Sequence, residues 1–224
     1  MANSNSSLNN GFDTFRLMSY NIRYATLLDL QYAWTYRKKI VSTLIKDRAD
    51  IACLQEALHS QIEDLKAALK DYKFIGVGRD DGKHQGEYVP IFYNHHKFKI
   101  LEKGHFWLSQ TPSVAGSKSW DSKYPRMCTW ALFSLKEHEG QSANPNLPKF
   151  YVFNTHLDHL SNEARLEGTK VILKFIQEKA QEKNVPIFLV GDFNSDLGAD
   201  VYDLITKGQD SFTMQDTAQT SLTG

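Results

Sequence analysis

The stretch "FLVGDFNSD" at residues 188–196 decides how the fold of this chain is interpreted. Its apolar run ends at a glycine, and then a carboxylate, Asp192, and an amide, Asn194, follow one residue apart. The run is typical of a buried β-strand. Taken alone, Asp192 and Asn194 indicate a turn or a helix N-cap. The same arrangement recurs elsewhere in the chain, however, and this recurrence favours a functional interpretation.

Three further apolar segments end on polar residues. Residues 15–22 end near Asn21, residues 50–56 end on Glu56, and residues 149–159 carry Asn154, His156 and Asp158. Because open α/β sheets bind ligands beyond the carboxyl ends of their strands, four such ends predict one shared cleft. Converging carboxylate and amide oxygens suit Mg²⁺ or Mn²⁺. A nearby histidine supplies a proton donor or a phosphate contact.

Each of these residues also has a simpler explanation. Glu56 can be a solvated glutamate after a strand, and Asn21 can cap a turn. His156 alone is more often a hydrogen-bonded structural histidine than a catalyst. The joint pattern favours the cleft, because chance rarely ends four strands in this way.

Composition limits the classes of function. The chain has 224 residues, 41% of them hydrophobic, which suits one large domain. Lys plus Arg and Asp plus Glu are both 26, so a nucleic-acid binder that depends on a strong basic field is disfavoured. Residues 1–13 predict a flexible tail without a secretory signal, and no apolar run is long enough to span a bilayer. These features predict a cytoplasmic protein without membrane association.

Strands alternating with helices predict one α/β domain. Further strands are expected at residues 72–77, 88–94, 129–135 and 185–192, and helices at 37–49, from 161 and at 200–205. Ser60 and Glu63 predict a capping box that opens another helix. In the helix at 37–49, one apolar face is expected to carry Ile40, Val41, Leu44 and Ile45. The turn-rich segment 109–127 predicts a long loop.

Four motifs occur in a fixed order: "MSYNIR" (18–23), "CLQEAL" (53–58), "NTHLDH" (154–159) and "VGDFNSD" (190–196). This ordered set resembles the endonuclease/exonuclease/phosphatase (DNase-I-like) superfamily. "GVGRDDGKHQGEYVPIFYN", "FWLSQTP" and "PRMCTWALF" resemble a bacterial branch of small metal-dependent hydrolases within it. The resemblance implies an α/β four-layer sandwich, over residues 14–224, of two facing mixed β-sheets flanked by helices.

The resemblance also implies roles. Glu56 matches the principal metal ligand, with Asn21 and Asp192 beside it. Asp192 and Asn194 match the pair that orients the attacking water, and His156 matches the histidine that contacts the scissile phosphate. Substrate-binding positions are implied more loosely at Asp158, His159, Glu87 and Arg126. For Arg126, a surface salt bridge is an equal alternative to a phosphate contact.

The chain departs from the family pattern after Asn194. The resemblance implies an Asp-His pair near the C-terminus whose histidine is the general base, but the only Asp-His here is Asp158-His159. We therefore expect a C-terminally truncated chain that lacks a core strand. Loss of the base is expected to lower the rate by about 10²–10⁴. His159 is the candidate substitute.

The sequence thus predicts a Mg²⁺- or Mn²⁺-dependent phosphoesterase, a monomer, that hydrolyses a small phosphorylated substrate such as a sugar phosphate by activated water. Cys53 and Cys128 lie in apolar stretches and are expected to be buried thiols, which disfavours a cysteine phosphatase. Trp107, Trp120 and Tyr124 can stack on a substrate ring or pack in the core. The alternatives are a DNA or RNA nuclease of the same fold, or a catalytically impaired binding module without the base.

Overall fold

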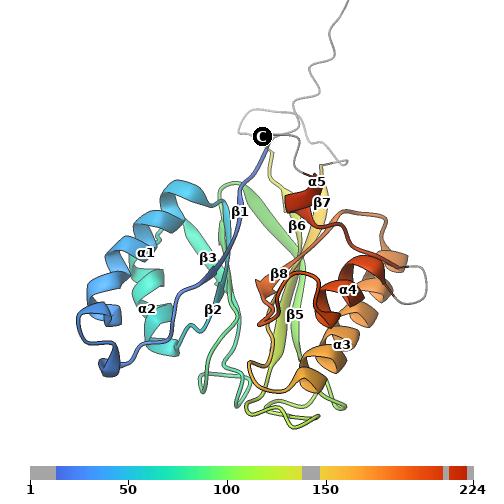
Figure 1. Ribbon diagram of the computed structural model, residues 1–224. Helices are drawn as coiled ribbons and strands as arrows, with labels where there is room; N and C mark the ends of the chain where they lie inside the picture. The colour runs from blue at the N-terminus through green and yellow to red at the C-terminus, as the bar shows by residue number, and fades with distance from the viewer. Residues whose placement is uncertain (1–13, 138–146, 209–211, 221–224) are drawn as a thin grey trace, which may run out of the picture.

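Two four-stranded β-sheets lie face to face, with helices on both outer faces (Figure 1). The computed structural model describes residues 14–137, 147–208 and 212–220. This is the four-layer α/β sandwich expected from the sequence. The predicted tail at residues 1–13 lies outside the described residues.

The first sheet has the order β1-β2-β4-β3 and is mixed, since β1 pairs with β2 in parallel and the other pairs are antiparallel. Its strands are β1 (Leu17–Asn21), β2 (Ile51–Gln55), β3 (Tyr72–Ile75) and β4 (Ile91–Asn94). Its outer face is covered by α1 (Trp34–Arg48) and α2 (His59–Ala68), and the 3₁₀ helix η1 (Leu27–Tyr32) precedes α1.

The second sheet has the order β5-β6-β7-β8, with only β7 and β8 parallel. Its strands are β5 (Phe98–Trp107), β6 (Met127–Leu135), β7 (Lys149–His156) and β8 (Ile187–Asp192). Its outer face is covered by α3 (Asn162–Glu182) and α4 (Asp200–Lys207), and α5 (Thr217–Thr220) follows.

The two parallel pairs place the site. Each pair is joined by a helical crossover, α1 in the first sheet and α3 in the second, so within a pair both carboxyl ends lie at the same edge. The pairs also meet across the sandwich, because β1 and β2 contact β8, and β2 contacts β7. Four strand ends therefore converge on one region of the molecule.

The core follows the alternation of side chains along each strand. In β2, Ala52 and Leu54 face α1 and α2, whereas Ile51 and Cys53 face the other sheet. In β7, Tyr151 and Phe153 likewise face α3, and Phe150 and Val152 point between the sheets. Three apolar layers thus separate the four structural layers.

Three local expectations are wrong or incomplete. Ile40 and Leu44 are exposed on α1, because the buried stripe runs along Trp34, Val41 and Ile45 instead. The helix predicted from Ser60 begins earlier, at His59, and the side chain of Gln61 accepts from the Leu58 N–H in place of a Ser60–Glu63 box. β5 was not predicted, since "FKILEKGHFW" mixes charged and apolar residues irregularly.

Cys53 and Cys128 are free and buried, as expected, and burial raises the pKa of both thiols. In the part of the chain that the structure describes, no helix has the length and apolar character needed to cross a membrane.

Candidate active site

Between the sheets, apolar side chains give way to polar ones at the carboxyl ends of the four central strands. Leu17, Cys53, Val152 and Val190 belong to the apolar layer between the sheets. Alternation then brings the next inward-facing positions to the same region. These polar residues are Asn21, Gln55, Asn154, His156 and Asp192.

Asn21 links two carboxylates that come from different sheets. Its Nδ2 lies 2.8 Å from Glu56 Oε1 and 2.9 Å from Asp192 Oδ2, and donates to both. Its Oδ1 accepts from the Arg23 N–H at 2.9 Å, which fixes the orientation of the amide. The residues predicted as metal ligands are therefore together, but Asn21 presents its NH₂ group to the carboxylates rather than its oxygen.

Glu56 reaches this position through an unusual backbone conformation. It follows Gln55, so strand alternation would direct its side chain to the helix-covered face. Its φ is 61°, in the left-handed region that costs a non-glycine residue about 1–3 kcal/mol. Glu56 Oε2 accepts from the Tyr24 N–H at 3.1 Å, so the carboxylate is held from both sides. The left-handed backbone conformation at Glu56 is what directs the carboxylate into the site.

Asp192 is positioned by the close approach of β8 to β7. A Cβ on Gly191 would lie 2.3 Å from the Thr155 carbonyl oxygen, and φ is 154°, so only glycine fits. Asp192 Oδ1 accepts from the Asn194 N–H at 3.0 Å, and the Asn194 side chain donates to the Leu157 carbonyl. The glycine, carboxylate and amide of the opening motif thus form one turn.

A buried pair of amides joins the sheets directly beneath these carboxylates. Gln55 Nε2 donates to Asn154 Oδ1 at 2.8 Å, and Asn154 Nδ2 donates to the carbonyls of Leu54 and Pro90. Gln55 and Asn154 are both almost completely buried. This network fixes the separation of β2 and β7 and therefore the relative position of Glu56 and His156.

His156 lies between two acidic groups. Its Nε2 is 3.8 Å from Asp192 Oδ2, and its Nδ1 is 3.9 Å from Glu87 Oε2. Burial, followed by the positive charge of Arg126, lowers the pKa of His156 to about 4. The ring is therefore neutral near pH 7 and buried Nδ1 has no hydrogen-bond partner among the described residues.

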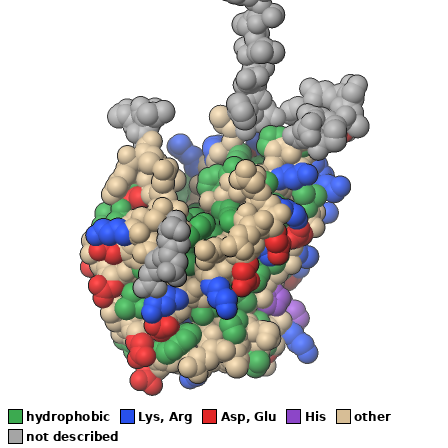
Figure 2. All heavy atoms as spheres, turned by 90° about the vertical axis from the view of Figure 1, so that its right-hand side faces the viewer, with side chains coloured by type: hydrophobic (Ala, Val, Ile, Leu, Met, Phe, Trp, Pro, Cys, Tyr) green, Lys and Arg blue, Asp and Glu red, His purple; other side chains and the backbone are tan. Residues whose placement is uncertain are grey.

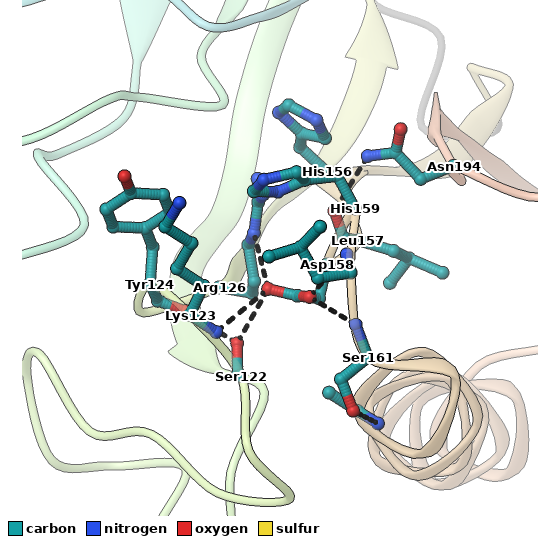
Figure 3. A network of polar contacts seen from close by, with 12 residues as sticks. Ser122, Lys123, Tyr124, Arg126, His156, Leu157, Asp158, His159, Ser161 and Asn194 are labelled. Carbon is teal, nitrogen blue, oxygen red and sulfur yellow. Dashed lines mark hydrogen bonds and ion pairs between the residues drawn. The ribbon is translucent and has the colours of Figure 1, made fainter.

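Asp158 anchors the neighbouring loop. Its Oδ1 accepts from the N–H groups of Leu160 and Ser161, and its Oδ2 accepts from Ser122 Oγ and the Lys123 N–H (Figure 3). Burial acts to raise the pKa of Asp158, but the hydrogen bonds from these groups keep that pKa below its usual value. These contacts occupy both oxygens and favour a positioning role for Asp158 over substrate contact.

Arg126 and His159 are in direct contact. Arg126 Nη2 donates to His159 Nδ1 at 2.9 Å, and Arg126 Nε lies 3.7 Å from Asp158 Oδ2. Arg126 is 5% exposed, so the surface salt bridge considered from the sequence is excluded. Glu87 pairs with Arg79 rather than with Arg126, and Arg79 Nη1 donates to Glu87 Oε2 at 2.6 Å.

All nine predicted site residues thus lie in one connected region, although sequence reasoning missed two of its members. Gln55 shows no signal beyond ending a strand, and Arg79 lies in a charged, turn-rich loop where an arginine is ordinary. Of the predicted stacking residues, Trp107 is buried and donates to the Arg79 carbonyl, while Tyr124 is 41% exposed.

An open groove of about 440 Å³ gives access to Asp192 and Asn21. It is lined by Ser19, Asn21, Gln55 and residues 191–195. An adjoining, more apolar cavity of about 560 Å³ runs along β8 and α4. Within the described ranges, no three His, Cys, Asp or Glu side chains are grouped to hold a metal ion. A cation here would rely on Glu56 and Asp192 together with oxygens from water and substrate.

The fold and site define a class of α/β sandwich: two facing mixed sheets that bring carboxylates, amides and an imidazole together at the ends of their parallel strands. The Endonuclease/Exonuclease/phosphatase family model matches residues 18–223. The chain belongs to this family, whose members are hydrolases that include phosphatases and nucleases.

Solved structures of bacterial proteins support this assignment. An endonuclease/exonuclease/phosphatase of Bacteroides vulgatus is 39% identical with a TM-score of 0.84, over 93% of this chain and 76% of that one. A mannosyl-6-phosphatase of Bacteroides thetaiotaomicron is 40% identical with a TM-score of 0.78, over 85% of this chain and 69% of that one.

Similarity to curated proteins is weaker. The CCR4-Not complex 3'-5'-exoribonuclease subunit Ccr4 of Mycosarcoma maydis is 24% identical over 88% of this chain and 36% of its own length. The chain spans between 27% and 48% of the length of the first three curated relatives it matches.

Proposed function

We propose that this protein is a divalent-metal-dependent phosphoesterase that hydrolyses an ester of a small phosphorylated molecule, such as a sugar phosphate, by attack of water. The observation that carries this proposal is the Asn21 amide, which holds Glu56 and Asp192 within 2.9 Å of one nitrogen. Two carboxylates so close together repel each other unless a cation or hydrogen bonds compensate. The arrangement therefore suits a bound cation.

Glu56 and Asp192 would hold Mg²⁺ or Mn²⁺, for which one or two carboxylates with water and phosphate oxygens are the usual ligands. When bound, such a cation neutralises charge that develops on the phosphoryl oxygens and lowers the pKa of a coordinated water. Asn21 orients both carboxylates. Asp192 and Asn194 would orient the attacking water at the same turn.

His156 and Arg126 would contact the phosphoryl oxygens from the opposite side. The neutral imidazole offers one N–H donor, and the guanidinium offers a fork that matches two oxygens. The contacts disfavour His159 as a substitute general base. Because its Nδ1 accepts from Arg126, the proton of the neutral ring lies on Nε2, and no lone pair remains to accept a proton from water.

The small-molecule substrate is favoured by the equal numbers of acidic and basic residues and by the 40% identity to a mannosyl-6-phosphatase. A nuclease is the second candidate, because three of the curated relatives are named as 3'-5'-exoribonuclease subunits. A binding module without catalysis is the third. The monomeric state and the cytoplasmic location stay predictions.

Hydrolysis of a panel of phosphate esters tests the proposal. Release of phosphate from hexose phosphates and cleavage of a short oligoribonucleotide are measured with Mg²⁺, with Mn²⁺ and with a chelator. We expect metal-dependent turnover of a hexose phosphate. Glu56→Gln and Asp192→Asn should each lower kcat by at least about 100-fold without unfolding the protein.

Glu63→Gln is the matched control, because Glu63 is an exposed glutamate on α2 that pairs with Lys66 and lies outside the proposed site. Its kcat should equal that of the wild type. Turnover that persists in Glu56→Gln, or that needs no metal, contradicts the proposed site. Cleavage of the oligonucleotide alone favours the nuclease, and no hydrolysis of any ester favours the binding module.

A further inference from the structure

Two buried arginines lie at the edge of the site, and only Arg126 was expected there. Arg79 is 8% exposed and Arg126 is 5% exposed. Arg79 comes from the loop after β3, and Arg126 immediately precedes β6. The backbone N–H of Arg79 donates to the Glu87 carbonyl, and Trp107 Nε1 donates to the Arg79 carbonyl at 2.6 Å. The backbone of Arg79 is thus held through both its N–H and its carbonyl group.

Both guanidinium groups keep donors without partners. Arg79 Nε, Arg126 Nε and Arg126 Nη1 are buried, and none of them has a hydrogen-bond partner among the described residues. A buried donor that is left unpaired costs about 1–3 kcal/mol, and more when it is charged. Three such donors in one place point to a ligand that supplies several acceptor oxygens.

The carboxylates nearby do not serve all these donors. Asp158 accepts four hydrogen bonds, from Ser122 and Lys123 and from the two residues before α3, and Arg126 Nε remains 3.7 Å away. Glu87 binds one nitrogen of Arg79, and Asp80 Oδ1 lies 3.8 Å from Arg79 Nε, beyond hydrogen-bond distance. Burial, and then the positive charge of Arg79, lower the pKa of Arg126. A dianionic ligand would relieve the repulsion between these two positive charges.

The arginine pair adjoins the proposed catalytic groups. Glu87, which pairs with Arg79, lies near one nitrogen of the His156 ring. Asp192, which accepts from Asn21, lies near the other nitrogen. Arg126 contacts the ring of His159, which stacks against Tyr124 with ring centroids 6.1 Å apart (Figure 3). The Arg79 guanidinium lies 4.8 Å from the centre of the Tyr124 ring, which holds its plane in place.

We propose that Arg79 and Arg126 together bind the phosphoryl group of a phosphate monoester as a dianion, and so make the protein selective for monoesters over diesters. This inference rests on the proposed function, which it narrows. A monoester phosphoryl group has three non-bridging oxygens and about two negative charges, whereas a diester has two such oxygens and one charge. Two guanidinium groups together offer enough N–H donors for the three oxygens of a monoester, and more than the two oxygens of a diester can accept.

Binding measurements that need no turnover test the pair directly. Calorimetric titrations with inorganic phosphate and with dimethyl phosphate are done in the presence of Mg²⁺ at about pH 8, above the second pKa of a phosphate monoester. The variants are Arg79→Gln and Arg126→Gln, with exposed Arg48→Gln on α1 as the control for loss of one positive charge. Arg79→Lys keeps the charge and removes the fork.

We expect each glutamine variant to weaken phosphate binding by about 10- to 100-fold, the usual effect of losing a hydrogen bond to a charged group. Binding of dimethyl phosphate should change by less than about threefold, and Arg48→Gln should match the wild type. Arg79→Lys should weaken phosphate binding by an intermediate factor. If Arg79→Gln does not fold, the phosphate affinity of Arg79→Lys tests the role of Arg79. An affinity for phosphate equal to that of the wild type then overturns the inference.

Turnover adds a second readout. The ratio of kcat/KM for p-nitrophenyl phosphate to that for bis(p-nitrophenyl) phosphate should fall by about 10- to 100-fold in Arg79→Gln. Equal loss on both substrates, or unchanged phosphate affinity in a folded variant, overturns the arginine pair but leaves the phosphoesterase standing. Conversely, a wild type that hydrolyses no ester but binds phosphate through Arg79 overturns the proposed function alone.

Discussion

At the scale of single residues, the site depends on two backbone conformations that few side chains tolerate. Glu56 has a φ of 61°, which directs its carboxylate away from the face that strand alternation assigns to it. Gly191 has a φ of 154° and lies against the Thr155 carbonyl. The sequence predicted that Asn21, Glu56 and Asp192 would gather, and the structure brings them together. The sequence alone could not predict that Asn21 would donate to both carboxylates, because the orientation of its amide is set by the hydrogen bond from the Arg23 N–H.

Gly191→Ala tests the role of this close approach. The new Cβ would lie 2.3 Å from the Thr155 oxygen, so β8 must shift and Asp192 with it. We expect the free energy of unfolding to fall by more than about 1 kcal/mol, measured by urea denaturation. Gly198→Ala is the matched control, because Gly198 also has a positive φ but has nothing within 4 Å of its added Cβ. Equal losses in the two variants would contradict the steric explanation.

At the scale of elements, the order of strands and helices was largely predictable, because each buried strand shows an apolar run bounded by turn residues. β5 was not, since charged and apolar residues follow one another irregularly along it, with Leu101 exposed and Glu102 half-buried at a shift of register. Arg79 was missed for a related reason. Its loop carries charges throughout, and only the pairing of Arg79 with Glu87 across the loop shows that this arginine is buried. A pairing set by the path of the loop leaves no signal in a single sequence.

Asp50 joins the starts of three strands at the end opposite the site. Its carboxylate is 5% exposed, and it accepts from the Arg16 N–H and from Lys97 Nζ, both at 2.8 Å. Burial acts to raise the pKa of Asp50, but the hydrogen bonds from Lys97 and Arg16 prevail and lower it. A folded-state pKa below the unfolded value stabilises the protein above about pH 4, and this stabilisation is lost as the pH falls through the folded-state pKa.

We therefore expect Asp50→Asn to lower the free energy of unfolding by about 1–3 kcal/mol near pH 7, with a difference from the wild type that shrinks toward about pH 3. Urea denaturation across this pH range measures it. Asp29→Asn should have a much smaller effect, because Asp29 pairs with Arg23 in an exposed ion pair. A difference between Asp50→Asn and the wild type that grows on acidification would contradict the lowered pKa of Asp50.

At the scale of the whole molecule, two strand–helix–strand units face each other, and their parallel strands end in one place. This architecture explains why four separated motifs form one site. The balance of surface charge supports the small substrate proposed above. Lys plus Arg equals Asp plus Glu at 26 each, and on the face drawn in Figure 2 side chains of both signs are interspersed. Such a face lacks the continuous basic stripe that long nucleic acids require.

Binding of a short oligoadenylate is accordingly expected to depend little on salt. Fluorescence anisotropy with Glu56→Gln, which should not cleave the probe, measures the affinity at about 50 and about 200 mM salt. We expect a loss of less than about tenfold, whereas a protein that neutralises six or more phosphates loses about a thousandfold or more. A steep salt dependence with tight binding would favour the nuclease.

The central claim is that Glu56 and Asp192, held by Asn21, form one divalent-cation site. Calorimetric titration of Mn²⁺ into the wild type, Glu56→Gln and Asp192→Asn tests it most directly, with Glu63→Gln as the control. The account predicts one site in the wild type and in the control, and affinity at least about tenfold weaker in the other two variants. Wild-type Mn²⁺ affinity in folded Glu56→Gln and Asp192→Asn would contradict it.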